Sequence, residues 1–456
     1  MQILFLTPQL PYPPRQGATL RNYHLIRALA AQHTVDLLTL LAPGETLHAA
    51  SPLHSLCRHV AAVAQPRRTA ARRAWETVRS PLPDMAHRLD TPALHTLLQT
   101  WMQNTDYDII QFEGIELAPY LATARTVSTA TSTATATATA TAHAPALVFD
   151  NHNCEYLLQK RNALNDLRTP QRMIGGIYSL VQWWKLRRYE RWACQSATAT
   201  LAVSQPDADA LTALAGPDCP VHVIPNGIAA PTVPPTPSAS PASAATAADA
   251  PITLVFTGKM DYRPNVDAVL WFAHEVLPRI TRAYPQTVFQ IVGMNPHPRI
   301  LPLGEQRNIE ITGMVEEIQP YIQEATVFVI PLRVGGGTRF KVLEALAAAR
   351  PVVSTTLGVE GIAVIHGEHL RLADTPSAFA QAVLDLIADQ RDDGGAQARK
   401  MGANAQRFVT THYTWDSIVP RLNALYQTLQ PEAQQPDLRH RDKSKQSGQS
   451  MPKDQP

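Results

Sequence analysis

Short runs of apolar residues alternate with stretches of helical periodicity along most of the chain. In the first half, the apolar runs predict buried strands at residues 2–6, 35–41, 109–112, 146–149 and 198–203. Helical patterns predict helices at residues 21–31, 173–195 and 206–215. Strands that are apolar throughout and separated by helices are typical of a parallel sheet covered on both faces. The first half therefore predicts an α/β domain.

The second half repeats this alternation. Strands are predicted at residues 252–257, 288–292, 309–312, 327–330 and 352–355. Helices are predicted at residues 265–283, 339–349, 376–387 and 396–411. Because ligands bind to such sheets at the carboxyl ends of the strands, the two halves predict a ligand-binding cleft between them.

Three segments of biased composition interrupt the pattern. Residues 126–144 alternate Thr and Ala, and the period of two is compatible with a strand. These side chains bury little apolar surface, so we expect an expanded, mobile loop. Residues 229–251 are rich in Pro, Ala and Ser and predict a linker, whereas residues 431–456 predict a disordered tail.

The linker separates the two expected domains. An N-terminal domain over residues 1–228 precedes it, and a C-terminal domain over residues 252–411 follows it. We expect a last helix at residues 412–430 to pack back on the N-terminal domain.

Composition and charge exclude several classes of protein. The chain has 456 residues, of which 45% are apolar and 17% charged, enough apolar material for two or three domains. Its 40 basic and 38 acidic side chains give a net charge of +2, so we expect no nucleic-acid partner. Four cysteines without a C-x-x-C pair argue against a zinc ribbon or a disulfide scaffold. With no signal-peptide pattern and no apolar run of about 20 residues, we expect a soluble, cytoplasmic protein.

A glycine-rich loop follows the strand predicted at residues 327–330. Gly335, Gly336 and Gly337 form this loop, and a helix is expected to begin near Thr338. Consecutive glycines let the backbone approach a ligand closely, and the free N–H groups of a helix start favour an anion. The segment therefore predicts a phosphate-binding site.

Charged residues in the first turns of that helix support the same chemistry. Arg339 in the first turn can donate two hydrogen bonds to a phosphate, and Lys341 adds a second positive charge. Glu344 lies three residues beyond Lys341 and can accept hydrogen bonds from sugar or ribose hydroxyls. The alternative is a surface helix with a Lys341–Glu344 pair. That alternative explains poorly why basic residues stand where the helix dipole disfavours them.

The segment at residues 329–354 resembles the signature of family 4 glycosyltransferases of the GT-B fold. The resemblance implies two Rossmann-like domains, each with a doubly wound parallel sheet, that face each other across a nucleotide-sugar cleft. Further segments fit the same template in order, at residues 8–21, 203–204, 223–228, 256–265, 291–293, 311–315 and 355–361. Most of residues 1–430 are covered in this way.

The sequence departs from the family pattern at one position. The family commonly has two glutamates separated by seven residues; Glu344 matches the second, and Gly336 stands at the first. The resemblance implies that the first contacts the donor sugar and the second holds the ribose. A related branch has glycine here and supplies Arg and Lys from a G-T-R-x-K run, which is present in this chain.

Other residues on the donor side follow from the same resemblance. Gly258, Lys259 and Arg263 lie in the turn after the strand at residues 252–257 and are expected to face the donor. Gly17 lies before the first helix and would let the backbone approach the donor phosphates or the acceptor. The alternatives are an exposed basic pair on a turn and an ordinary turn glycine.

Polar residues follow two neighbouring strands of the first half. His152 comes after the strand at residues 146–149 and matches a histidine that the family often places near the donor sugar. Asp150 and Glu113 are weaker candidates for the acceptor side. A row of polar residues after an apolar strand is also typical of an ordinary turn.

The resemblance implies a retaining glycosyltransferase of hexosyltransferase type. It would transfer a sugar from a nucleotide-diphosphate donor to a glycan or lipid-linked acceptor of the cell surface, with His152, Arg339 and Lys341 as catalytic residues. We expect no metal and no cofactor beyond the nucleotide sugar, because no metal-ligand cluster is visible. A nucleotide-sugar epimerase of the same fold and an inactive nucleotide-sugar binder are the alternatives. A dinucleotide-dependent dehydrogenase is not favoured, since no G-x-G-x-x-G follows a strand.

Two basic, aromatic segments bear on contact with a membrane. Residues 67–79 place Ala71, Ala74, Trp75 and Val78 on one helical face among arginines, as in helices that lie on anionic lipid. The alternative is a solvated helix that packs this stripe on the domain. Residues 181–192 are also basic and aromatic, and we expect that helix to face the core.

Overall fold

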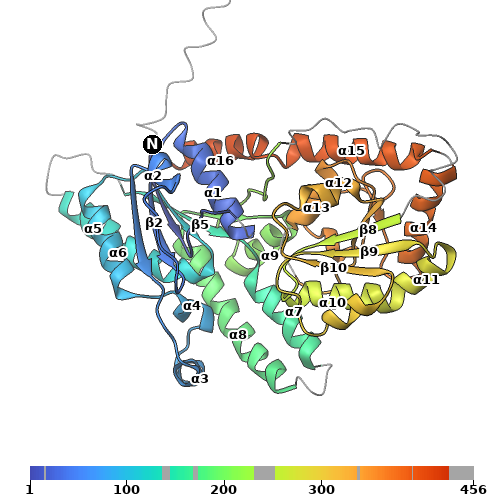
Figure 1. Cartoon of the computed structure of the whole chain (residues 1–456). Helices are drawn as coiled ribbons and strands as arrows, with labels where there is room; N and C mark the ends of the chain where they lie inside the picture. Colours follow the sequence, from blue (N-terminus) through green and yellow to red (C-terminus); the bar gives the residue numbers. More distant parts are fainter. Residues whose placement is uncertain are drawn as a thin grey trace, which may run out of the picture.

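The structure is a computed structural model that describes residues 1–14, 17–135, 144–167, 173–230, 252–335, 339–392 and 394–430. Within these ranges the chain forms two parallel sheets, each with helices on both sides (Figure 1). The predicted fold class, two doubly wound α/β domains, is confirmed. None of the helices in these ranges has both the length and the apolar character needed to cross a membrane.

The N-terminal sheet has seven parallel strands among the described residues, in the order β3-β2-β1-β4-β5-β6-β7. The strands are β1 Gln2–Thr7, β2 Thr34–Leu41, β3 His59–Ala64, β4 Ile109–Glu113, β5 Ala146–Asn151, β6 Ala199–Ala202 and β7 Val221–Val223. The surrounding helices are α1 Gly17–Ala30, α2 Leu53–Leu56, α3 Ala70–Arg79, α4 Asp84–Arg88, α5 Pro92–Asn104, α6 Ala118–Thr135, α7 Glu155–Leu167, α8 Met173–Ser196 and α9 Gln205–Ala215.

The C-terminal sheet has six parallel strands in the described ranges, in the order β10-β9-β8-β11-β12-β13. The strands are β8 Ile252–Thr257, β9 Thr287–Val292, β10 Ile309–Gly313, β11 Val327–Ile330, β12 Val352–Ser354 and β13 Arg371–Leu372. The helices are α10 Arg263–Trp271, α11 Leu277–Ala283, α12 Gln319–Glu324, α13 Phe340–Ala347, α14 Pro376–Asp392, α15 Ala396–His412 and α16 Trp415–Leu429.

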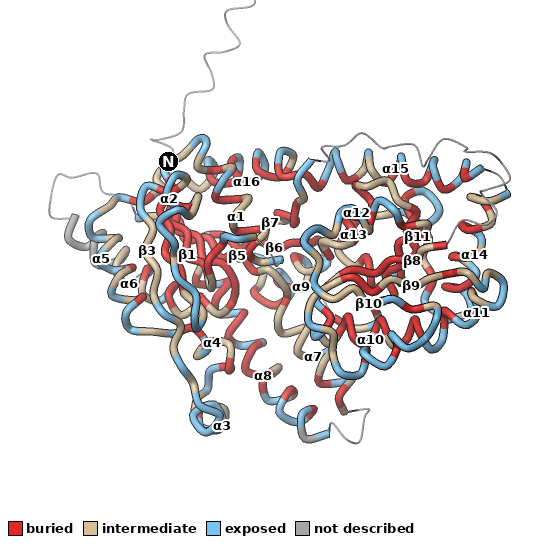
Figure 2. Tube along the Cα trace, in the orientation of Figure 1, coloured by how far each residue is buried: buried red, intermediate tan, exposed pale blue. Residues whose placement is uncertain are grey.

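Alternation along β1 explains why the N-terminal sheet is covered on both faces. Ile3 and Phe5 join one buried cluster with α1 and α16, whereas Leu4 and Leu6 join another with α5 and α6. Successive side chains of a strand point to opposite faces, so an unbroken apolar run requires two covering layers. Figure 2 shows burial concentrated on the two sheets and on the helix faces turned toward them.

The last helix returns to the N-terminal domain. Trp415, Ile418 and Leu422 of α16 share a buried cluster with Leu25 and Leu29 of α1. The long red helices α15 and α16 follow each other along one side of both domains (Figure 1).

The structure corrects the loop predicted at residues 126–144. Residues 126–135 are the last part of α6, and residues 136–143 lie outside the described ranges. Alanine is a strong helix former, and the polar side chains bond back to the preceding turn. Thr126 Oγ1 donates to the carbonyl of Ala122 at 2.9 Å, and Ser128 Oγ donates to that of Ala124 at 2.9 Å. In the helix these hydroxyls bond to backbone carbonyls, whereas in a loop they would bond to water.

Other predictions for this part of the chain fall outside the described residues. The linker is described only at residues 229 and 230, and the tail at residues 431–456 is not described.

Candidate active site

The loop after β11 brings a glycine against a guanidinium. Gly335 has a φ of 111°, and a Cβ placed on it would lie 3.0 Å from Nη2 of Arg339. A side chain here would be strained by the positive φ and would crowd the guanidinium. Gly336, Gly337 and Thr338 lie outside the described residues, so the rest of the predicted loop stays a prediction.

Arg339 stands immediately before α13. The helix begins at Phe340, so Arg339 has an extended backbone at the N-cap position, one residue before the first turn where the sequence predicted it. Its side chain is buried, with 9% exposed. Burial lowers the pKa of Arg339, and the charge of Arg161 lowers it further. The charges of Tyr262, Glu360 and Asp207 act in the opposite direction. The guanidinium is a largely dehydrated cation at the border of the two domains.

Lys341 is held in the first turn of α13 by the turn after β8. Its Nζ donates a hydrogen bond of 2.9 Å to Oδ1 of Asn265 and lies 3.9 Å from the centre of the Phe256 ring. Burial lowers the pKa of Lys341 to about 7, and the charge of Arg339 acts in the same direction. The ammonium therefore loses its proton near neutral pH, and a bound anion would keep it protonated.

Glu344 lies one turn further along α13. Burial raises the pKa of Glu344, while the charge of Lys341 opposes this rise. Lys341 and Glu344 influence each other's pKa, but no hydrogen bond or salt bridge between these two described side chains is found; Lys341 bonds to Asn265 instead. The alternative of a surface Lys341–Glu344 pair is therefore wrong, because Lys341 turns inward to Asn265.

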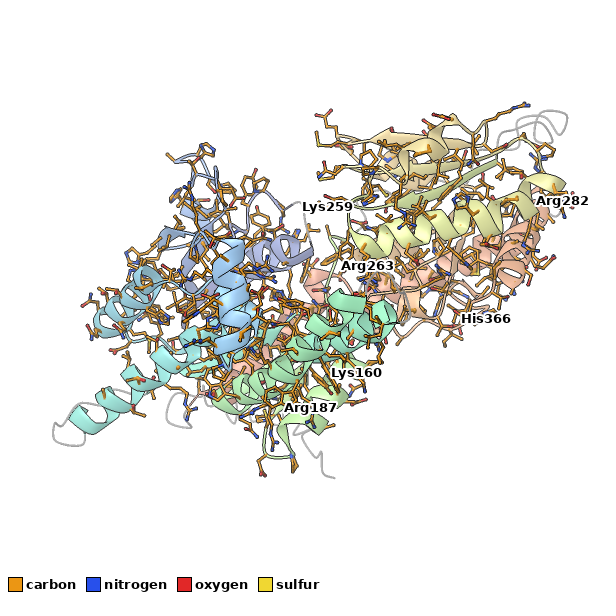
Figure 3. The ribbon with its side chains drawn as sticks, turned by 90° about the horizontal axis from the view of Figure 1, so that it is seen from below. Lys160, Arg187, Lys259, Arg263, Arg282 and His366 are labelled. Atoms are coloured by element: carbon orange, nitrogen blue, oxygen red, sulfur yellow. The ribbon has the colours of Figure 1, made fainter. Side chains whose placement is uncertain are left out.

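Of the three residues predicted in the turn after β8, one lines the Lys341 ammonium. Gly258 has a φ of 152°, and a Cβ there would lie 2.8 Å from Nζ of Lys341. Lys259 is nearly half exposed and pairs with Asp261 at 3.6 Å. Figure 3 shows Lys259 and Arg263 at the end of the C-terminal domain that faces the N-terminal domain.

Arg263 links the two domains, and its contact with the donor stays a prediction. Its guanidinium donates to both oxygens of Asp166 on α7, at 2.6 and 3.2 Å. The arginine thus joins the two domains through an ion pair, and its fork-shaped donor set is already used. A second link from α7 lies nearby, where Arg161 donates to both oxygens of Glu360 at 2.7 Å.

Gly17 lies at the point where the two domains approach each other. It is the first residue of α1, and a Cβ on it would lie 3.3 Å from Cε2 of Phe340, the first residue of α13. The starts of the two helices therefore meet at the border of the domains. Both carry N–H groups without helical partners, so positive potential converges there.

His152 belongs to a buried hydrogen-bond network at the carboxyl end of β5. Its Nε2 lies 2.7 Å from Oε2 of Glu113, and Nε2 of Gln111 donates to Oε1 of Glu113 at 2.5 Å. Burial lowers the pKa of His152, but the hydrogen bond and charge of Glu113 raise it by more, so the net shift is upward. The hydroxyl of Tyr426 on α16 donates to Oε1 of Gln111.

Asp150 forms an ion pair with an arginine that the sequence did not single out. Nε and Nη2 of Arg21 on α1 donate to Oδ2 of Asp150 at 2.9 and 2.8 Å. Nη1 of the same arginine donates to the carbonyl of Pro225 and to Oδ1 of Asn226. Burial raises the pKa of Asp150, and the charge of Arg21 limits the rise. An arginine on the buried face of a predicted helix was the available signal.

The structure corrects the acceptor-side role predicted for Glu113 and Asp150. Both carboxylates have an exposed fraction of 0% and bond to Arg21, Gln111 or His152. A substrate cannot reach them without displacing these partners. They hold other side chains in place.

The same cluster has the composition of a cation site. One ligand atom each from Glu113, Asp150 and His152 lie within 4.8 Å of one another. However, Arg21 places two N–H groups on Asp150, and Glu113 accepts hydrogen bonds on both oxygens. A divalent cation would have to face the guanidinium and displace these bonds, so the residues do not fit a metal.

Two family models match the chain. Residues 15–230 match the model described as Glycosyltransferase Family 4, and residues 251–389 match the one described as Glycosyl transferases group 1. The first range covers the N-terminal sheet beyond β1, and the second covers the C-terminal sheet. Together the two ranges account for most of the described chain.

One curated relative is the GDP-mannose-dependent alpha-(1-6)-phosphatidylinositol monomannoside mannosyltransferase of Mycobacterium tuberculosis. It is 30% identical over 161 residues, which are 32% of this chain and 40% of that protein. The matched segments span from 40% to 59% of the length of the curated relatives.

Solved structures share the whole two-domain arrangement. Sucrose-phosphate synthase from Thermosynechococcus elongatus has a TM-score of 0.65 at 17% identity, over 94% of this chain and 99% of that chain. HepE from Anabaena in complex with UDP has a TM-score of 0.59 at 15% identity, over 94% of this chain and 100% of that chain. At these identities the likeness shows the fold, and it confirms the predicted GT-B arrangement.

Proposed function

Because the chain belongs to the GT-B glycosyltransferases, with a family 4 region followed by a group 1 region, we propose that it transfers a sugar from a nucleotide-diphosphate sugar to a glycan or lipid-linked acceptor. We place this transfer in the synthesis of cell-surface polysaccharide or glycolipid. The name of the mycobacterial relative includes a GDP-mannose donor and a phosphatidylinositol mannoside, and the Anabaena structure contains UDP, which supports both parts of the proposal.

One observation carries the proposal: a buried guanidinium and a partly buried ammonium stand where two helix starts meet. Arg339 is buried before α13, and Lys341 is enclosed by Asn265, Phe256 and Gly258. The start of α1 approaches from the other domain. Desolvation and Arg339 disfavour the charge of Lys341, so an anion bound beside the two side chains would stabilise both, and a diphosphate matches both the charge and the N–H donors.

These residues would act on the leaving group. The bond between the anomeric carbon and the diphosphate oxygen breaks, and the acceptor hydroxyl oxygen forms a bond to the same carbon. The acceptor proton passes to an oxygen of the departing diphosphate. Arg339 and Lys341 stabilise the negative charge that develops there. We propose that the acceptor attacks on the face that the diphosphate leaves, which retains the configuration.

Two further residues would position the donor. Glu344, one turn beyond Lys341, would accept hydrogen bonds from the ribose hydroxyls. His152 has its Nε2 on Glu113, which leaves Nδ1 to donate to a hydroxyl of the donor sugar. The raised pKa of His152 favours the protonated ring that such donation needs.

A ligand-binding experiment tests the donor site. Thermal unfolding is measured with a series of nucleoside diphosphates and nucleotide sugars for the wild type, Arg339→Ala, Glu344→Ala and the control Arg282→Ala at the far end of the C-terminal domain (Figure 3). Ligand at 100 times its Kd stabilises the fold by about 2.7 kcal/mol. We expect a shift for the wild type and the control, and a smaller one for the two site variants. If no compound shifts the wild type, the donor-site assignment is wrong.

Product analysis separates the proposal from its alternatives. A nucleotide sugar that raises the melting temperature is incubated with the protein alone and with extracted glycan or lipid acceptors. A transferase modifies an acceptor, whereas an epimerase converts the sugar without one. An inactive relative would bind the donor and give no product in either case.

A further inference from the structure

The helices α3 and α8 expose apolar side chains at one end of the N-terminal domain. The exposed fractions are 60% for Trp75, 84% for Val78, 56% for Ile177, 40% for Val181 and 54% for Trp184. Figures 1 and 2 show α3 and the first half of α8 both extending below the N-terminal sheet, as two separate projections. We call these five side chains, together with Arg79 and Arg188, the α3–α8 surface.

The amphipathic pattern of α3 is turned outward. Its apolar residues Trp75 and Val78 face solvent, and Glu76 is its buried residue. Glu76 accepts from Arg68 and Arg72, and Arg68 also pairs with Asp84. The helix thus hides its carboxylate and presents its apolar stripe, the opposite of an ordinary surface helix. The alternative predicted for residues 67–79, a stripe packed on the domain, is wrong.

The helix α8 continues this surface. Ile177, Val181 and Trp184 are spaced four and three residues apart and share one face, while Leu186 and Tyr189 on another face are buried. The prediction of a core-facing helix at residues 181–192 therefore holds for one face of α8 only.

The two helices are in contact at the C-terminal end of α3. Nζ of Lys185 on α8 donates to the carbonyls of Thr77 and Ser80, at 2.6 and 2.7 Å, and so binds the end of α3. The backbone N–H of Asp84 donates to Oε1 of Gln182 at 2.8 Å. These hydrogen bonds connect the C-terminal end of α3 and the start of α4 to α8.

Positive charge surrounds the apolar side chains. The guanidinium of Arg188 lies 4.9 Å from the centre of the Trp184 ring, and that of Arg79 lies 6.0 Å from that of Trp75. Arg187 on α8 and Lys160 on α7 are exposed on the same lower side (Figure 3). Exposed tryptophans next to arginines suit the boundary between lipid tails and anionic headgroups.

We propose that the α3–α8 surface binds an anionic lipid bilayer. The basic side chains complement lipid phosphates, and Trp75, Val78, Val181 and Trp184 enter the headgroup layer. A second copy of this chain would oppose like charges, so the charge pattern disfavours self-association. The binding would bring a lipid-linked acceptor and the enzyme to the same surface, but it does not depend on the transfer reaction.

Co-sedimentation with vesicles tests the proposal without donor or acceptor. The full chain is mixed with vesicles of phosphatidylcholine alone or with added phosphatidylglycerol. We expect binding only with phosphatidylglycerol and weaker binding at high salt, because screening reduces the attraction. Equal binding to both vesicles, or none to either, would overturn the proposal.

Surface variants locate the contact. Arg188→Glu and Arg79→Glu should each lower vesicle affinity by about fivefold or more, and Trp75→Ser with Trp184→Ser should lower it further. The controls are Arg282→Glu and Met314→Ser, since Met314 is 75% exposed on the other domain. Unfolding midpoints check that each variant is folded. The assignment is wrong if the controls lose as much affinity as the surface variants, or if the wild type sediments as a dimer whose formation the same variants abolish.

Discussion

Tyr426 donates a hydrogen bond to Gln111, although 315 residues separate the two along the chain. Gln111 in turn donates to Glu113, which holds His152. The last helix of the described chain therefore supports the side chain that we place beside the donor sugar. The return of α16 to the N-terminal domain therefore both completes the core there and orients His152 through this chain of hydrogen bonds.

Tyr426→Phe removes only the hydroxyl at the end of this network. Oε1 of Gln111 would then be a buried acceptor without a donor, which costs about 1–3 kcal/mol of unfolding free energy. Chemical denaturation measures the loss. The matched control is Tyr321→Phe on α12, for which no hydrogen bond of the hydroxyl is found among the described residues, and it should stay within about 0.5 kcal/mol of the wild type. A loss no larger than that of the control would show that the network does not need Tyr426.

Glu113→Gln should lower the pKa of His152. The carboxylate outweighs the effect of burial on this ring, so its removal leaves burial as the dominant influence. The ring resonance is followed by NMR against pH and assigned with His152→Gln, with exposed His366 as the internal control. Because the folded pKa is raised, the charged ring stabilises the wild type fully below about pH 6.5, and this contribution is lost as the pH rises through the folded pKa. An unchanged pKa in Glu113→Gln would contradict the assignment.

Much of the fold follows from the sequence, because buried strands have a local signature. The apolar runs of β1, β2, β4, β8 and β11 mark the central strands, which are covered on both faces. By contrast β3, β7 and β13, which the sequence did not predict, lie at sheet edges and are only half buried. Half-buried strands lack the continuous apolar run that marks the central strands, so β3, β7 and β13 give a weaker signal, whereas the edge strand β10 was predicted.

The site was predictable where it is local and not where it depends on distant contacts. Gly335, Arg339 and Lys341 stand in one short segment, and the structure places them together. Arg21 and Tyr426 reach the site only through the fold. The ion pair between Arg263 and Asp166 was not predicted for the same reason, because Asp166 lies on the other domain, 97 residues away.

Nucleotide binding should weaken as the pH rises above neutral. The pKa of Lys341 in the free protein is about 7, because burial and Arg339 disfavour its charge. A bound diphosphate favours the charged form, so binding takes up a proton between pH 7 and the higher pKa of the complex, and affinity falls by at most about tenfold per pH unit. Titration calorimetry, in buffers of different ionisation enthalpy, of the nucleoside diphosphate that gives the largest thermal shift measures this uptake. Lys341→Met should abolish it, and uptake that persists in this variant would assign the proton to another group.

Removing one partner of the buried pair Arg21–Asp150 should cost far more stability than removing one partner of an exposed pair of similar geometry. The side chains of the buried pair are 1% and 0% exposed, whereas those of Arg333 and Asp267 are 44% and 32% exposed at 2.9 Å. Asp150→Ala leaves a guanidinium buried without its counter-charge and should cost about 3–5 kcal/mol. Asp267→Ala should cost about 0–1 kcal/mol, because water screens that pair. The double variant Arg21→Met with Asp150→Leu should recover part of the loss, since it removes both charges together. Urea unfolding of the three variants measures these differences. Equal losses for Asp150→Ala and Asp267→Ala would mean that water reaches Arg21, and that α1 does not hold Asp150 in the way its hydrogen bonds indicate.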